Sequence, residues 1–190
     1  AIAAPALARF KRIYVLGFSL GGHMTLRFAT EDTDPRVRAV AALCAPLDLS
    51  EGRRELDRPR AAVYRKHLLD GLKEIYRGVA ARAPVQTPLD TVLRIRTLLD
   101  WDAATVCPRF GFREPEDYYA AVSVAHRIER VRLPTVFVAA PDDPIVPRRT
   151  IDPVLARAPA HFQTLFAPVG GHVGFPRTLF WGDGAPRSAR

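Results

Sequence analysis

Residues 11–45 alternate between two apolar runs and a glycine-containing segment, and this alternation constrains the fold more than any other feature. The first run, Ile13–Leu16, is apolar and partly β-branched, which favours a strand. Met24–Thr30 follows two glycines and is typical of a helix, and Asp34-Pro35 marks a turn. Val37–Cys44 is again apolar, as a strand covered on both faces would be. The pattern predicts a βαβ unit, and therefore a parallel sheet with a right-handed crossover.

The rest of the chain supplies a helical stretch and then a second alternation. In the helical stretch, apolar residues recur at steps of three or four and predict one amphipathic helix: Tyr64, Leu68, Leu72, Ile75 and Val79. Thr87 is expected to cap a second helix, and a third is expected to begin near Glu114. A strand, a short helix and another strand are then expected at Thr135–Ala140, Ile151–Ala158 and Phe162–Phe166. The chain is thus predicted to be α/β, with residues 1–45 and 131–190 as the core and residues 46–130 as a helical insertion.

The segment Gly17-Phe18-Ser19-Leu20-Gly21 has the pattern G-x-S-x-G. A predicted strand precedes it and a predicted helix follows, which is the context that a nucleophilic serine on a strained turn requires. We expect the flanking glycines to remove Cβ atoms that would collide at this turn. The helix N-terminus would present the Leu20 N–H to a developing oxyanion. These features predict Ser19 as a nucleophile and Leu20 as an oxyanion donor.

A serine hydroxyl needs a general base, and the chain has five histidines. The first four are expected on a helix beside the turn, on the amphipathic helix, before an arginine-rich turn and just before a strand: His23, His67, His126 and His161. His172 lies in Gly170-Gly171-His172-Val173-Gly174-Phe175, after the last predicted strand. A glycine-rich loop at that place can reach across the carboxyl edge of the sheet. We therefore predict His172 as the base.

The base needs a carboxylate to orient it. Asp143 is favoured because Asp142-Asp143-Pro144 directly follows an apolar strand. Asp142, its neighbour, and Asp48, which follows an earlier strand, are the alternatives. With Asp143 the chain order is Ser, Asp, His, the order of α/β-hydrolases.

The sequence resembles the α/β-hydrolase superfamily and, within it, the YheT-like branch related to the ABHD esterases. The resemblance is carried by the elbow and by four further segments: Ala45–Leu49, Glu116–Tyr119, Asp142–Pro144 and Gly170–Phe175. It implies a carboxylic-ester hydrolase with a parallel-sheet α/β-hydrolase fold and with Ser19, Asp143 and His172 as its charge-relay set. It also implies that residues 46–130 form a lid over an acyl pocket. The expected substrate is a small ester, and the apolar helices favour an apolar acyl group.

Members of this superfamily place several strands and helices before the nucleophile strand, whereas about a dozen residues precede it here. Those elements carry the second oxyanion donor, often in an H-G-x-x-G motif, which this sequence lacks. We therefore expect the chain to be the C-terminal portion of the fold, a weak esterase by itself, with a strand edge open to pairing with another chain. The alternative is a catalytically impaired remnant that acts as a binding protein.

Composition and charge argue against several other classes of function. The net charge is +8, yet the basic residues are spread along the chain without interleaved aromatics, which argues against nucleic-acid binding. No apolar run approaches the ~18 residues of a membrane span, so no stable membrane insertion is predicted. Cys44 and Cys107 are far apart and are expected to be free thiols, which suits a reducing cytoplasm. The histidines and cysteines lack zinc spacing, and no cofactor is expected.

Overall fold

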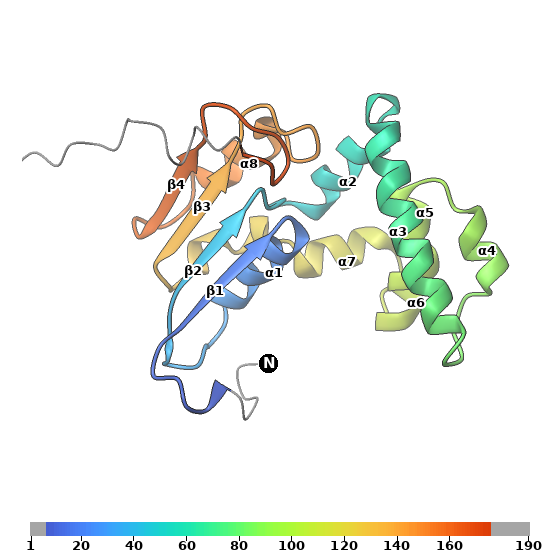
Figure 1. Ribbon diagram of the computed structural model, residues 1–190, viewed down its shortest axis with the longest axis horizontal. Coiled ribbons are helices and arrows are strands. Elements are labelled where there is room, and N and C mark those ends of the chain that lie inside the picture. The colour runs from blue at the N-terminus through green and yellow to red at the C-terminus, as the bar shows by residue number, and fades with distance from the viewer. Residues whose placement is uncertain (1–6, 176–190) are drawn as a thin grey trace, which may run out of the picture. The chain divides into compact units, whose positions relative to one another are not determined.

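The computed structural model describes residues 7–175 (Figure 1). These residues form two compact units, one comprising 7–47 and 124–175 and the other comprising Asp48–Ser123. The first unit contains the strands and is called the core unit below. The second consists of helices and is called the helical unit.

The core unit is built on a four-stranded sheet (Figure 1). Its strands are β1 (Ile13–Phe18), β2 (Val37–Leu43), β3 (Thr135–Ala139) and β4 (Phe162–Phe166). They lie in the order β1-β2-β3-β4, and each neighbouring pair is parallel. The predicted α/β class with a parallel sheet is therefore confirmed. All four carboxyl ends meet at one edge of the sheet, where residues from distant parts of the sequence come together.

Helices cover one face of this sheet. α1 (Leu20–Ala29) and α8 (Arg148–Leu155) both contribute to the core that includes Phe137 of β3, and Leu26, Phe137 and Ile151 are completely buried there. The short 3-10 turns η4 (Val124–His126) and η5 (Ile128–Arg130) add to the same core. Both α1 and α8 begin earlier than the sequence predicted. The apolar pattern does not mark their first turns, because that of α1 contains glycine and that of α8 is polar.

The opposite face of β1 presents large apolar side chains. Tyr14, Leu16 and Phe18 alternate along the strand and are 67%, 57% and 50% exposed. Among the described strands, β1 has β2 as its one neighbour, so it forms an edge of the sheet. A strand edge of this kind leaves backbone N–H and C=O groups available for pairing.

The helical unit contains six α-helices among its described elements. They are α2 (Leu49–Asp57), α3 (Ala62–Ala80), α4 (Leu89–Arg94), α5 (Leu98–Trp101), α6 (Cys107–Phe110) and α7 (Pro115–Val122), with the 3-10 turn η2 (Pro59–Ala61) and the π-helical turn η3 (Asp102–Val106) between them. The long helix α3 lies where the amphipathic helix was predicted. Of the predicted apolar stripe, only Leu72 is packed, together with Leu69 and Tyr76, against Val92 and Trp101. Its other four members are exposed: Tyr64, Leu68, Ile75 and Val79.

Side-chain caps begin two of these helices, and neither is the predicted one. Asp48 accepts a hydrogen bond from the Glu51 N–H at the start of α2, and Thr97 caps α5 in the same way. Thr87 was expected to cap α4, but Pro88 occupies the cap position and the Thr87 hydroxyl donates to the carbonyl oxygen of Ala104. The prediction was wrong because the threonine side chain makes this more distant contact instead.

The two ends of the helical insertion are joined in the core unit. The Ala125 N–H donates to the Leu47 carbonyl oxygen at 2.9 Å. Both residues are buried. None of the helices within residues 7–175, including the 19-residue α3, combines the length and apolar character needed to traverse a lipid bilayer.

Candidate active site

Ser19 occupies the turn between β1 and α1. Its φ of 49° and ψ of −123° lie outside the regions that L-residues usually adopt. The Ser19 N–H donates to the Leu43 carbonyl oxygen at 2.8 Å, which continues the ladder to β2 beyond the end of β1. The first helical hydrogen bond then runs from the His23 N–H to the Ser19 carbonyl oxygen at 3.1 Å. This is the strand–strained turn–helix context that gives the G-x-S-x-G pattern its significance.

Close approach of the backbone explains two glycines of this segment. A Cβ atom at Gly17 would lie 2.2 Å from the Gly21 carbonyl oxygen and 2.5 Å from Thr25 Oγ1. A Cβ at Gly22 would lie 2.9 Å from the Ala45 Cβ. A Cβ at Gly21 would meet nothing within 4 Å, so the expected crowding there is wrong. Crowding falls instead on Gly22, which faces the sheet from the first turn of α1.

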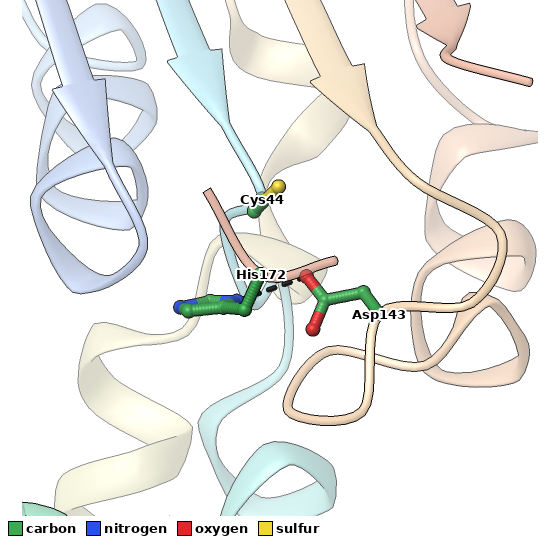
Figure 2. Close-up of side chains that lie close together, drawn as sticks. All are labelled: Cys44, Asp143 and His172. Atoms are coloured by element: carbon green, nitrogen blue, oxygen red, sulfur yellow. Dashed lines mark hydrogen bonds and ion pairs between the residues drawn. The ribbon is translucent and has the colours of Figure 1, made fainter. Parts of the chain in front are cut away.

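At the carboxyl edge of the sheet, His172 lies within hydrogen-bonding distance of both Ser19 and Asp143. His172 Nε2 is 2.8 Å from Ser19 Oγ. His172 Nδ1 is 2.9 Å from Asp143 Oδ2, and Figure 2 shows this pair joined by a dashed line. With the ring proton on Nδ1, that nitrogen donates to the carboxylate and Nε2 accepts from the serine hydroxyl. The three side chains that the sequence grouped together are thus brought together by the fold.

The Asp143 carboxylate is held by the backbone that follows it. Its Oδ1 accepts from the N–H groups of Ile145 and Val146 at 2.8 and 2.9 Å, which leaves Oδ2 to the imidazole. Asp143 is only 3% exposed. The alternatives differ: Asp142 is exposed, and Asp48 serves as the cap of α2.

The remaining histidines have other surroundings. His23 is buried in α1 with its Nδ1 2.7 Å from the Pro46 carbonyl oxygen, and His161 Nε2 lies 2.8 Å from the Val131 carbonyl oxygen. His67 and His126 are exposed.

Leu20, the predicted oxyanion donor, is the first residue of α1. Its N–H precedes the first helical hydrogen bond and therefore has no carbonyl partner within the helix. The N-terminus of a helix also favours negative charge. The residue directly after the serine therefore has the backbone placement that an oxyanion donor needs.

Cys44 is a member of this site that the sequence predictions did not include. It directly follows β2 and is fully buried, and its Sγ lies within 4.8 Å of ligand atoms of both Asp143 and His172 (Figure 2). Cys44, Asp143 and His172 together offer a sulfur, a carboxylate oxygen and an imidazole nitrogen, which are atoms that can bind a metal ion. The Asp143 carboxylate and His172 Nδ1, however, already share a hydrogen bond. Burial is the main cause that raises the pKa of the Cys44 thiol, so the thiol stays protonated. Its place at a strand's carboxyl end is the signal that could have revealed it.

Comparison with known proteins finds relatives that include an abhydrolase domain-containing protein and an esterase. No protein-family model matches the chain. An abhydrolase domain-containing protein of Dictyostelium discoideum is 27% identical over 173 residues, which cover 90% of this chain and 44% of that protein. YheT of Escherichia coli, which is named as an esterase, is 28% identical over 163 residues, covering 84% of this chain and 48% of YheT. The chain therefore spans less than half the length of these relatives.

Among solved structures, that of AbyA5 superposes with a TM-score of 0.55 at 21% sequence identity, covering 95% of this chain and 44% of AbyA5. A likeness at this identity concerns the fold. The parallel sheet, the serine turn and this likeness show an α/β-hydrolase fold. In sequence, the chain is similar to the YheT- and ABHD-like proteins of the α/β-hydrolase superfamily.

Proposed function

We propose that this chain carries the catalytic residues of a serine hydrolase that acts on carboxylic esters through an acyl-enzyme intermediate. The observation that carries the proposal is the unbroken hydrogen-bond chain from Asp143 through His172 to Ser19, at 2.9 and 2.8 Å. The relative YheT, which is named as an esterase, supports esters as the substrate class.

In the proposed reaction, Ser19 Oγ attacks the ester carbonyl carbon while its proton moves to His172 Nε2. The Leu20 N–H donates to the oxyanion that forms, and Asp143 stabilises the imidazolium. His172 then gives the proton to the departing alcohol, which leaves an ester between the substrate acyl group and Ser19. Water repeats the sequence: its proton goes to His172, its oxygen attacks the acyl carbon, and Ser19 is released with the free acid. No metal or organic cofactor takes part in these steps.

A second oxyanion donor completes the proposal. Removing one such donor costs about 10²–10³ in turnover, or about 3–4 kcal/mol. We propose that another chain or segment pairs with the edge of β1 and supplies this donor. The exposed, alternating side chains of Tyr14, Leu16 and Phe18 support that pairing, because they offer apolar area next to an unpaired edge.

We propose the helical unit as the lid that selects the substrate. The apolar side chains that α3 exposes, Tyr64, Leu68, Ile75 and Val79, support an apolar acyl group. Both cysteines are free thiols, which supports a reducing compartment such as the cytoplasm.

Labelling with a fluorophosphonate probe tests the proposal without requiring turnover. We expect the probe to react with the chain at Ser19, located by mass spectrometry of the labelled peptide. Ser19→Ala should abolish the label, and Ser50→Ala, a serine of α2, should leave it unchanged. Absence of label on Ser19 in folded protein would contradict the proposal and favour a binding protein that kept the fold.

A further inference from the structure

Backbone strain in the core unit is concentrated around the proposed serine and histidine. Among residues 7–175, the three non-glycine residues with positive φ are Ser19, Cys44 and Val173, at 49°, 48° and 50°. L-residues avoid this region because the Cβ atom crowds the backbone, and such strain persists where surrounding contacts enforce it. The serine turn accounts for Ser19. Cys44 and Val173 contact each other.

The Cys44 side chain contacts the backbone on both sides of His172. The Val173 N–H donates to Cys44 Sγ at 3.4 Å, and the Cys44 thiol donates to the Gly171 carbonyl oxygen at 3.9 Å. The Cys44 N–H in turn donates to the Val138 carbonyl oxygen at 2.7 Å, which fixes the cysteine to β3. A single side chain therefore links the histidine loop to the centre of the sheet.

The histidine loop needs such a link because of its composition. Three glycines at 170, 171 and 174 leave its backbone with many accessible conformations. Within the loop, the Gly171 N–H donates to the Gly174 carbonyl oxygen at 2.9 Å, but this bond does not tie the loop to a strand. Val173 itself is 43% exposed, so packing of its side chain holds it only in part.

The thiol is also matched to its charged neighbour. Cys44 Sγ lies within 4.8 Å of an Asp143 carboxylate oxygen (Figure 2). A neutral thiol can stay there, whereas a thiolate would repel the carboxylate. In the neutral state its sulfur accepts from one amide while its S–H donates to a carbonyl.

We propose that Cys44 is a positioning residue for His172: by holding Gly171 and Val173, its thiol keeps the imidazole between Ser19 and Asp143. This proposal rests on the proposed hydrolase function. Cys44 would act through His172 and would not touch the substrate. Displacements near 1 Å cost about 100-fold in rate when they misplace reacting groups, so loss of the thiol should slow the reaction about 10- to 100-fold.

The test compares Cys44→Gly, Cys44→Ala and Cys44→Ser with Cys107→Ala, a matched control at the other buried free cysteine. Cys44→Gly relieves the positive φ and is therefore the variant expected to fold best while lacking the thiol. Three quantities are measured in the full chain: the maximal rate of fluorophosphonate labelling with its half-saturating probe concentration, the pH dependence of that rate, and the low-field proton resonance of His172 Nδ1–H.

We expect Cys44→Gly and Cys44→Ala to lower the maximal rate about 10- to 100-fold, with little change in the half-saturating concentration. The low-field resonance should broaden or disappear and the pH profile should shift. Cys44→Ser should recover most of the rate, and Cys107→Ala should match the parent chain.

A folded Cys44→Gly chain that labels at the parental rate would overturn the positioning role. So would a slower chain whose low-field resonance and pH profile are both unchanged. A parent chain that does not label at Ser19 contradicts the hydrolase function instead, so the two failures are distinct.

Discussion

Replacing Asp143 by asparagine probes the hydrogen-bond chain with almost no change in shape. The amide oxygen can still accept from the Ile145 and Val146 N–H groups, but an NH₂ group replaces the oxygen that faces His172 Nδ1 at 2.9 Å. Two donors cannot face each other, so the ring proton moves to Nε2. That nitrogen then donates to Ser19 Oγ across 2.8 Å and can no longer accept the serine proton. A histidine in the wrong tautomer lowers turnover about 10⁴-fold, or about 5 kcal/mol in barrier height.

The assay is the rate of fluorophosphonate labelling at Ser19, with Ser19→Ala as the floor. Asp142→Asn is the matched control, because Asp142 is the adjacent carboxylate and is exposed. We expect Asp143→Asn to fall toward the floor and Asp142→Asn to stay near the parent rate, with circular dichroism unchanged in both. If Asp143→Asn kept more than a tenth of the parent rate, the assigned roles of His172 and Asp143 would be refuted.

Two further predictions concern stability. Gly17→Ala should lower the melting temperature and abolish labelling, because its Cβ would lie 2.2 Å from the Gly21 carbonyl oxygen. Gly21→Ala, whose Cβ would meet nothing within 4 Å, should instead stabilise α1 by up to about 1 kcal/mol. Equal melting temperatures for the two variants would contradict this reasoning. Burial raises the pKa of Asp102 to about 6 despite the hydrogen bond from Tyr119. The folded chain therefore keeps a proton on Asp102 at pH values where the unfolded chain has lost it. As a result, the free energy of unfolding falls by about 3 kcal/mol between pH 4 and 6. Asp102→Asn should therefore be more stable than the parent at pH 7.5 in urea titrations, with the difference shrinking at pH 5; a difference independent of pH would count against this reasoning.

The sequence allowed the sheet and the grouping of Ser19, Asp143 and His172 to be predicted, because apolar runs mark parallel strands and their carboxyl ends share one edge. It allowed less to be predicted where a residue's partner is distant. Thr87 resembles a helix cap in its local context, yet its hydroxyl reaches Ala104 instead. Cys44 was assigned to the last position of the predicted strand Val37–Cys44, because its left-handed backbone has no local sequence signal of the kind that glycine gives.

On α3, two apolar stripes coexist at helical spacing. The sequence pattern favoured the one containing Ile75, but packing in the helical unit buries Leu69 of the other stripe. Periodicity identifies a helix with an apolar side, whereas the choice between two such sides depends on the neighbouring helices.

The backbone hydrogen bond between Leu47 and Ala125 separates the helical insertion from the part of the chain that holds Ser19, Asp143 and His172. The chain leaves the core at one residue and re-enters it beside the same residue, so a linker of a few amino acids could replace Asp48–Ser123 without moving any strand. With the proposed lid role and the proposed hydrolase function, exchange of this helical segment by recombination at two adjacent backbone positions would change the ester preference and leave Ser19, Asp143 and His172 in place.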